Sequence, residues 1–292
     1  MTITKAVIAV AGYGTRLLPA TKAVPKEMLT VVDRPCIQHL VEEAAKSGIT
    51  DVILVTRPGS EAIDQHFASS PALEAHLVEQ GKDKLLETVR AVSSLANVTS
   101  VIQSADLPYG NGSPILAAKD HLEPGEGFVY MFGDDLVLSD VPAVKQLVDT
   151  YDAHNPAAVI AVQEVPDDML SAYGMVALKP GTDPMELDAI IEKPTKEEAP
   201  SNLAQFGRFV LSYKAVEVLE QTALGKGNEL WLTDAIDRLS KDDRVLVQKI
   251  EGTWYTTGDH YQLLIANIEY ALSDPQISDR LKAYLKAKAS SL

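Results

Sequence analysis

A glycine-containing loop near the N-terminus concentrates basic side chains. It has the sequence AVAGYGTRLLPATKAVPKEML (residues 9–29) and contains no acidic residue before Glu27. Glycine lets the backbone approach a ligand closely, and neighbouring cations neutralise phosphate charge. We therefore interpret the loop as a candidate polyphosphate site, with a solvated basic loop as the alternative. The residues that would carry this chemistry are Gly12, Gly14, Arg16, Lys22 and Lys26.

Two common phosphate-binding motifs do not fit this loop. A dinucleotide-binding fingerprint would need a third glycine where Leu17 stands, and a helix that Pro19 and Pro25 disfavour. A GK[ST] phosphate loop is absent from the sequence. A phosphate site in this loop would therefore be of another type.

A second candidate site is the acidic pair in FGDD (residues 132–135), which ends an apolar run. A hard cation such as Mg²⁺ favours carboxylate oxygens. Taken alone, an acid at the end of a strand is more often solvated or a helix cap. The pair by itself therefore assigns no metal site.

Strand and helix patterns alternate along the first half of the chain. This alternation predicts an α/β fold with a largely parallel sheet, in which ligands bind at the carboxyl ends of the strands. The basic loop follows the first predicted strand, so its position suits a binding site. The predicted strands are residues 5–11, 51–57, 98–104, 128–135 and 157–165, and predicted helices include 35–48, 113–122 and 141–154.

The pattern changes after residue 165 into shorter elements. Two short strands near residues 173–181 and 185–194 precede a polar loop at 195–205. We find no internal repeat, and no linker long enough to separate independent domains. We therefore expect a single domain over residues 1–292. Its remaining predicted elements are a strand from 207 to 212, helices at 214–222 and 231–240, a strand at 244–252 and a long helix from about Asp259.

Composition limits the class of protein. The 292 residues are 46% hydrophobic and carry a net charge of −15, which argues against general nucleic-acid or anionic-membrane binding. No long apolar run or signal-peptide pattern is present, so we expect a cytoplasmic protein without membrane association. Cys36 is the single cysteine, which excludes an intrachain disulfide and a cysteine zinc site.

The order of residues in the basic loop resembles the signature loop of sugar-1-phosphate nucleotidyltransferases, in particular bacterial members that use UTP and glucose 1-phosphate. The resemblance extends over nearly the whole chain. It implies a Rossmann-like, mostly parallel central sheet with flanking helices and a small additional β segment at the sugar site. Further segments that carry it are LVTRPGSEAIDQHF (54–67), YGMV (173–176), IIEKP (190–194), APSNLA (199–204), GRFVL (207–211) and LTDAI (232–236).

The resemblance implies a nucleotidyl transfer. An oxygen of glucose 1-phosphate would attack the α-phosphorus of UTP in line, giving UDP-glucose and pyrophosphate. Both reactants are anions, so the site must neutralise charge and align them. Arg16 would hold the leaving phosphates, and Lys26, expected to be an exposed loop lysine, would bridge the α-phosphate and the sugar phosphate.

The resemblance also assigns binding residues. The backbone of Ala11 and Gly12 would meet the uracil, and Glu27 would contact the base, unless it is an ordinary surface carboxylate. Asp134 would bind Mg²⁺, while Asp135 would point elsewhere. At the sugar site, Glu192 would take glucose hydroxyls and Lys193 the sugar phosphate. The full nucleotide set is Ala11, Gly12, Gly14, Thr15, Glu27, Gln103 and Gly110, and Gly174 completes the sugar set.

Two departures from the family pattern matter. The turn beside the base is GNGSP (residues 110–114) where the family has a GLGHA-like turn, and Ala105 stands where the base-reading glutamine is usual. Gln103 can serve only if the loop is longer, so selection of uridine is less secure than nucleotidyl transfer itself. Thr256 replaces a usual aspartate that related enzymes use as a second metal ligand, and Asp259 is a possible substitute.

Three interpretations follow from the sequence. The first is the uridylyltransferase, and the second is a related enzyme for another nucleotide or sugar, which the GNGSP turn favours. The third is a non-catalytic regulator that binds a sugar nucleotide, which Thr256 would allow. The C-terminal helix ISDRLKAYLKAKA (277–289) could pack against another subunit, so a homo-oligomer is possible.

Overall fold

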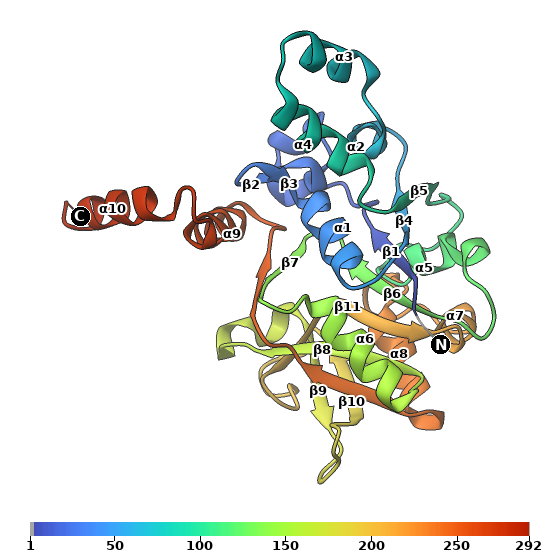
Figure 1. Ribbon diagram of the computed structural model, residues 1–292. Coiled ribbons are helices and arrows are strands. Elements are labelled where there is room, and N and C mark those ends of the chain that lie inside the picture. Colours follow the sequence, from blue (N-terminus) through green and yellow to red (C-terminus); the bar gives the residue numbers. More distant parts are fainter. Residues whose placement is uncertain (1–2, 292) are drawn as a thin grey trace.

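The computed structural model describes residues 3–291, and its main element is a large mixed sheet with helices on both faces (Figure 1). Within these residues the sheet has nine strands. The neighbouring strands β5, β4, β1 and β6 are parallel, β11 is antiparallel to β6 and β8, and β12 is parallel to β8. The predicted α/β fold with a mostly parallel central sheet is confirmed. The strands are β1 (Lys5–Ala9), β4 (Asp51–Thr56), β5 (Asn97–Ile102), β6 (Gly127–Phe132), β8 (Ala158–Glu164), β9 (Gly174–Leu178), β10 (Leu187–Glu192), β11 (Leu203–Ser212) and β12 (Val245–Lys249).

Two hydrophobic cores lie on opposite faces of the sheet. Successive side chains of a strand point to opposite faces, so Ala6 and Ile8 of β1 belong to one core and Val7 belongs to the other. The helices α1 (Cys36–Lys46) and α6 (Ala143–His154) cover the first face. The second face is covered by α5 (Ser113–Ala117), α7 (Lys214–Glu220) and α8 (Leu232–Asp242). Burial on both faces explains why the central strands are continuous apolar runs.

The carboxyl ends of the parallel strands meet at one edge of the sheet. The register pairs Ala9 of β1 with Val55 of β4 and with Phe132 of β6. The basic loop therefore leaves β1 beside the turn that follows β6. This alignment brings the two candidate sites, 108 residues apart along the chain at Lys26 and Asp134, to the same place.

The second half of the chain extends the sheet. The antiparallel pair β9–β10 joins the start of β11, with Glu192 opposite Gly174. Strand β11 begins at Leu203, four residues before the predicted start at 207. The prediction of a loop as far as residue 205 was wrong, because residues 203–205 pair with β8.

Two small two-stranded sheets were not predicted. Strand β7 (Asp135–Leu138) pairs with β13 (Thr253–Thr256), and β2 (Thr30–Val31) pairs with β3 (Arg34–Pro35). These strands are only two to four residues long. A sequence pattern of that length has no usable periodicity.

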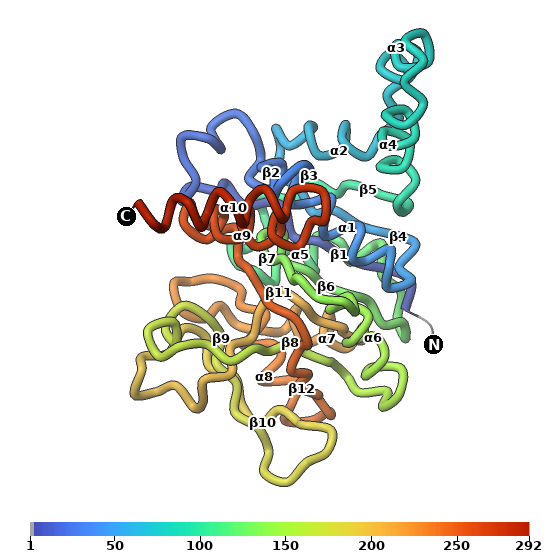
Figure 2. Tube along the Cα trace, turned by 60° about the vertical axis from the view of Figure 1, so that its left-hand side comes forward, coloured from blue at the N-terminus to red at the C-terminus, as the bar shows by residue number. Residues whose placement is uncertain are grey.

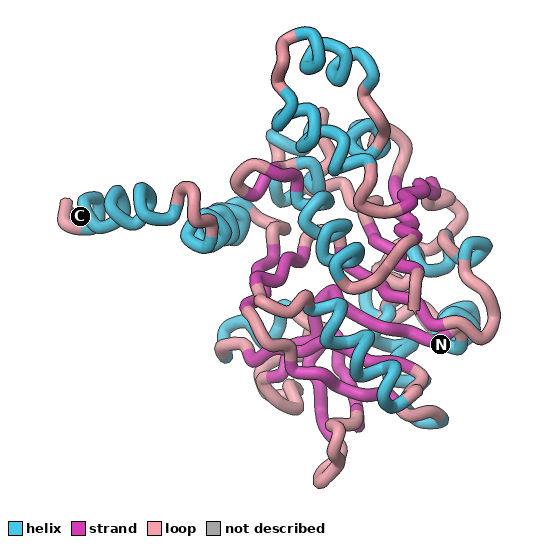
Figure 3. The backbone as a smooth tube through the Cα atoms, in the orientation of Figure 1, coloured by secondary structure: helices cyan, strands magenta, loops and turns pink. Residues whose placement is uncertain are grey.

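The remaining helices lie at the periphery. Figure 2 shows α3 and α4 as a helical pair at one end of the molecule, and Figures 1 and 3 show α10 projecting from the body beyond α9. Helix α9 packs against β13 and β2, and α10 against α9. No helix in residues 3–291 is both long enough and apolar enough to cross a bilayer. These helices are α2 (Glu61–Phe67), α3 (Pro71–Glu79), α4 (Asp83–Ser93), α9 (His260–Ser273) and α10 (Ser278–Ala289).

Candidate active site

The basic loop folds back on itself so that Lys26 returns beneath Gly14. Gly14 has a φ of 63°, and a Cβ on it would lie 3.0 Å from the Cβ of Lys26. The Thr21 hydroxyl donates a 2.8 Å hydrogen bond to the Gly14 carbonyl. Glycine is required at this position because an L side chain would be strained and would meet the lysine. The loop thus fixes the stem of Lys26.

Lys26 lies between two carboxylates. Its ammonium is 2.6 Å from Asp134 Oδ2 and 3.8 Å from Glu27 Oε1. The side chain is only 15% exposed, so the prediction of an exposed lysine was wrong. The turn after β6 covers it, a contact between distant segments that the loop sequence does not reveal. Burial lowers the pKa of Lys26, but the charges of Asp134 and Glu27 outweigh that effect and raise it above its usual value. Lys26 is therefore a charged group at neutral pH.

Asp134 lies in the turn between β6 and β7. Its backbone carbonyl accepts hydrogen bonds from the amide (2.6 Å) and hydroxyl (3.1 Å) of Thr257. Arg16, with its side chain 68% exposed, places one guanidinium nitrogen 4.0 Å from Asp134 Oδ2. Burial raises the pKa of Asp134, yet the charge and hydrogen bond of Lys26 hold it below its usual value. Asp134 therefore remains a carboxylate, with two cations beside it.

Glu27 is a buried acid without a hydrogen-bond partner. Both carboxylate oxygens lack one among the described residues, and the residue is 1% exposed. Burial raises its pKa to about 7, and the charge of Lys26 opposes this shift only in part. The alternative of an ordinary surface carboxylate is excluded. Contact with a nucleotide base stays a prediction for this residue.

Asp135 belongs to a different network from Asp134. Its carboxylate accepts hydrogen bonds from the indole of Trp254 (2.8 Å) and the amide of Gly207 (2.8 Å). The guanidinium of Arg208 donates to the Asp135 carbonyl (2.7 Å) and makes two hydrogen bonds of 3.0 and 2.7 Å to Glu43. The expectation that the Asp135 side chain points elsewhere than the Asp134 side chain is confirmed. Burial and the charge of Asp134 raise the pKa of Asp135 to about 6.

The three predicted sugar-site residues lie together at the β9–β10 pair. The Glu192 carboxylate accepts a 3.0 Å hydrogen bond from the Thr233 hydroxyl, and a Cβ on Gly174 would lie 3.2 Å from that carboxylate. Burial raises the pKa of Glu192, and Lys193 opposes the shift. The Lys193 ammonium is 4.3 Å from the centre of the Trp231 ring.

This region is linked to the β6 end through aromatic side chains. The Lys193 amide donates to the carbonyl of Tyr173 (3.1 Å). The Tyr173 ring meets Trp254 edge-on with centroids 4.7 Å apart. Trp254 in turn donates to Asp135, next to Asp134. A continuous set of contacts therefore joins the predicted sugar site to the predicted metal site.

The predicted base-reading residues come after β5, which β1 and β4 separate from β6 in the sheet. Gln103 directly follows β5, and its amide donates to the Thr56 carbonyl at the end of β4 (2.8 Å). Gly110 has a φ of 138°, and a Cβ on it would lie 2.3 Å from the Leu230 carbonyl oxygen. The GNGSP turn thus needs glycine at position 110. A side-chain contact between Gln103 and the Lys26 region is not observed among the described residues, so its role stays a prediction.

Thr256 and Asp259 have separate positions. Thr256 pairs with Asp135 across the β7–β13 sheet, and its hydroxyl accepts a weak 3.3 Å hydrogen bond from the Gly258 amide. Asp259 is the N-cap of α9, where its carboxylate accepts a 2.9 Å hydrogen bond from the Gln262 amide. An N-cap carboxylate is already in use for helix stability. Asp259 is therefore a poor replacement for the aspartate that the family pattern places at 256.

The donor set at Asp134 suits a metal that arrives with substrate. Among the described residues, no three His, Cys, Asp or Glu side chains form a group that could hold a metal ion. Mg²⁺ commonly binds through one or two carboxylates, substrate phosphates and water. One carboxylate beside two cations fits that arrangement when phosphate oxygens supply the other ligands.

Several residues that contact the site were not predicted from the sequence. Arg57, directly after β4, lies 4.8 Å from the Tyr13 ring centre and donates a long 3.4 Å hydrogen bond to the Gly12 carbonyl. Thr257 holds Asp134, and Thr233 holds Glu192. The position of Arg57 at a strand end was a usable signal. Thr233 and Thr257 become visible only through tertiary contacts.

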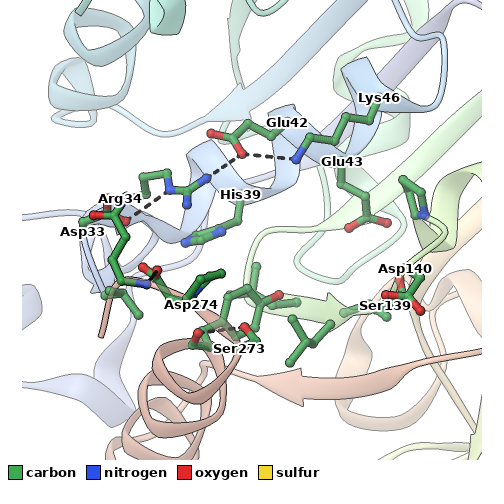
Figure 4. A pocket seen from close by; sticks show the side chains of 18 residues that line it. Asp33, Arg34, His39, Glu42, Glu43, Lys46, Ser139, Asp140, Ser273 and Asp274 are labelled. Atoms are coloured by element: carbon green, nitrogen blue, oxygen red, sulfur yellow. Dashed lines mark hydrogen bonds and ion pairs between the residues drawn. The ribbon is translucent and has the colours of Figure 1, made fainter. Parts of the chain in front are cut away.

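A separate cavity of about 600 Å³ lies between α1, β7 and the end of α9 (Figure 4). The predicted site residues do not line it. Its ion pairs join Arg34 to Asp33 (3.2 Å) and to Glu42 (2.9 Å), and Lys46 to Glu42 (3.6 Å). Glu43 at its wall is the partner of Arg208. The cavity is therefore separate from the candidate active site.

Comparison with known proteins agrees with this geometry. The nucleotidyl transferase family matches residues 5–272. UTP–glucose-1-phosphate uridylyltransferases are similar over 97% of this chain: that of Staphylococcus epidermidis at 44% identity, with 98% of its length covered, and that of Streptococcus pneumoniae at 45%, with 95% covered.

Solved structures give the same result. The UTP-bound enzyme of Acinetobacter baumannii is 35% identical with a TM-score of 0.88, over 97% of this chain and 98% of that one. A UDP-glucose pyrophosphorylase complexed with UDP-glucose is 32% identical with a TM-score of 0.83, over 93% and 100%. The chain therefore belongs to the nucleotidyl transferase family, in which these relatives are UTP–glucose-1-phosphate uridylyltransferases.

Proposed function

We propose that the protein transfers a uridylyl group from UTP to glucose 1-phosphate. A phosphate oxygen of the sugar forms a bond to the α-phosphorus of UTP, and the bond from that phosphorus to the bridging oxygen of the β-phosphate breaks. UDP-glucose and pyrophosphate are the products. The alignment of the whole chain with uridylyltransferases supports this assignment.

The observation that carries the proposal is the meeting of Lys26, Arg16 and Asp134 at the carboxyl edge of the sheet. Bringing two anions together requires cations placed before the reaction starts, because preorganised charge stabilises the transition state without reorganisation. Lys26 is charged and its stem is fixed. Arg16 is exposed and free to meet the outer phosphates of the nucleotide.

The other predicted residues receive roles that match their positions. In this proposal Lys26 contacts the α-phosphate and the sugar phosphate, and Arg16 the leaving pyrophosphate. Glu192 accepts hydrogen bonds from glucose hydroxyls and Lys193 binds the sugar phosphate. The nucleotide lies on the loop backbone, between Gln103 and the GNGSP turn. The proposed nucleotide contacts are Ala11, Gly12, Gly14, Thr15, Glu27, Gln103 and Gly110.

The family uses a divalent metal, and we propose Mg²⁺ for this chain. Asp134 would hold it together with phosphate oxygens and water. Bound there, the ion would neutralise charge on the phosphates. The protein contributes the orientation of the Asp134 carboxylate, which Thr257 fixes through the backbone.

A second candidate is the same reaction with another nucleoside triphosphate, which the altered GNGSP turn favours. One experiment separates the two. Purified protein with Mg²⁺ and glucose 1-phosphate is given UTP, dTTP, ATP or GTP, and pyrophosphate release is followed. We expect release with UTP to exceed the others by at least about tenfold. Equal release with all four would contradict the uridine assignment, and no release with any would favour a binding protein without turnover.

A further inference from the structure

Lys26 holds one oxygen of the carboxylate that is the proposed metal ligand. The ammonium lies 2.6 Å from Asp134 Oδ2, within a strong charge-assisted hydrogen bond. A metal ion on Asp134 Oδ2 would be repelled by an ammonium on the same oxygen, so metal binding at this atom requires the pair to open.

The structure places a second partner for Lys26 directly beside the first. Glu27 Oε1 is 3.8 Å from the ammonium, an ion pair that a small movement would tighten. Both oxygens of Glu27 lack hydrogen-bond partners among the described residues, although they are buried. A buried carboxylate without a hydrogen-bond partner lowers the stability of the folded protein, so its presence here needs an explanation.

The backbones of two glycines lie against the Lys26 side chain. A Cβ on Gly12 would lie 3.6 Å from Lys26 Cε, and a Cβ on Gly14 would lie 3.0 Å from Lys26 Cβ. Glu27 lies equally close to the backbone of Gly133, because a Cβ there would lie 3.1 Å from its Cγ. Both carboxylates lie within 3.8 Å of the Lys26 ammonium, so it can pass from one to the other by a small movement.

We propose that Glu27 is a positioning residue that holds Lys26 when the lysine leaves Asp134, which frees Asp134 for the metal. In the resting arrangement Lys26 pairs with Asp134. In the loaded arrangement it lies between Glu27 and the phosphates. Glu27 then acts on the metal site through Lys26 and is not itself a metal ligand. This inference rests on the proposed function for the identity of the ligands, but its test does not require turnover.

The test is binding of Mn²⁺ alone to the nucleotide-free protein, followed by the electron paramagnetic resonance signal of free Mn²⁺. Glu27→Gln should weaken binding about tenfold, because the lysine loses its alternative partner and stays on Asp134. Lys26→Met should tighten binding about tenfold, because the competing cation is gone. In the double variant the loss of Glu27 should have no further effect beyond about twofold.

The matched control is Glu126→Gln, which removes the partner of Lys5 (2.8 Å) outside the site and should leave Mn²⁺ binding unchanged. Thermal unfolding of each variant shows that it is folded. The proposal is overturned if Glu27→Gln binds Mn²⁺ like the wild type, if Lys26→Met fails to tighten binding, or if Glu27→Gln weakens binding equally when Lys26 is already methionine. Absence of turnover with any nucleotide would overturn the proposed function and leave these binding results decisive for Glu27.

Discussion

Two clusters of buried charge lie on either side of the end of β6, and they are organised differently. The Arg208 cluster comprises Glu43, Asp135, Arg208 and Trp254. The Lys26 cluster comprises Arg16, Lys26, Glu27 and Asp134. In the Arg208 cluster each charged group has hydrogen-bond partners at 2.7–3.0 Å. In the Lys26 cluster the Glu27 carboxylate has no hydrogen-bond partner within residues 3–291, and the Arg16 guanidinium lies 4.0 Å from Asp134 Oδ2.

This difference in hydrogen bonding suggests a structural role for the Arg208 cluster and a ligand-binding role for the Lys26 cluster. A buried charge that is fully paired stabilises one arrangement and leaves no capacity for a ligand. A buried charge without a partner destabilises the protein unless something else binds there. Asp134 lies in the turn after β6, and Asp135 is the first residue of β7. For these adjacent residues we propose opposite purposes: the Arg208 cluster fixes the local structure, and the Lys26 cluster presents charge to a ligand.

The largest expected effect on stability is that of Arg208→Met. Arg208 is fully buried and neutralises Glu43. Its loss leaves a buried carboxylate without a cation, which should lower the free energy of unfolding by about 3–5 kcal/mol. Urea unfolding measures this change. Adding Glu43→Gln to the variant should recover part of the loss, and a loss below about 1 kcal/mol would show that the cluster is not structural.

Lys26→Ala should reduce turnover by about 10² to 10³ while the protein stays folded. The reason is the loss of a fixed positive charge near the phosphates in the transition state. The measurement is pyrophosphate release with saturating UTP and glucose 1-phosphate, with Lys145→Ala, an exposed lysine of α6 outside the site, as the control. Turnover like that of the wild type in a folded Lys26→Ala protein would remove this lysine from the mechanism.

Glu27 should make stability depend on pH. Burial raises its pKa to about 7 in the folded protein, against an ordinary value of 4.5 in the unfolded chain. Between these values the unfolded chain loses the proton and the folded protein keeps it, so this group's contribution to stability falls as pH rises. The fall is about 3 kcal/mol at most. The stability of Glu27→Gln relative to wild type should thus be greater at pH 8 than at pH 5.

Urea unfolding of both proteins at these two pH values provides the measurement. Taking the difference between them cancels the titration of the other groups. An equal difference at pH 5 and pH 8 would mean that Glu27 is not a buried carboxylate with a raised pKa.

Thr256→Asp has the smallest expected effect. Thr256 stands where the family pattern has an aspartate, and it directly precedes Thr257, which holds Asp134. A carboxylate at 256 should therefore tighten Mg²⁺ binding by the nucleotide-free protein about tenfold. Isothermal titration calorimetry measures the affinity. Asp259→Asn is the control and should leave metal binding unchanged, because Asp259 is a helix cap. Weaker metal binding in Asp259→Asn would place the second ligand there.

Much of the fold was predictable because its signals are local. Buried parallel strands are apolar runs, and loops at their carboxyl ends meet at one edge, so the proximity of Lys26 and Asp134 follows from the pattern. The small sheet of β7 and β13 was not predictable, since strands of four residues carry too little pattern.

The burial and pairing of the charged residues at the site could not be predicted from the sequence. Lys26 and Glu27 lie in a loop whose composition suggests exposure, and they are buried because the β6 turn covers them. Arg208 lies inside a predicted strand, and its partner Glu43 is 165 residues away in a predicted helix. Pairing across such separations depends on packing, which periodicity does not encode.

The most direct test of the central claim compares Asp134→Asn with Asp135→Asn, two isosteric changes at neighbouring positions. Pyrophosphate release and the free energy of unfolding are measured for both. We expect Asp134→Asn to lose at least about 10² in turnover with little loss of stability. Asp135→Asn should lose about 1–3 kcal/mol of stability, with turnover per folded molecule within about tenfold of wild type. The opposite result, with the larger loss of turnover in Asp135→Asn and the larger loss of stability in Asp134→Asn, would contradict the division between the Lys26 and Arg208 clusters.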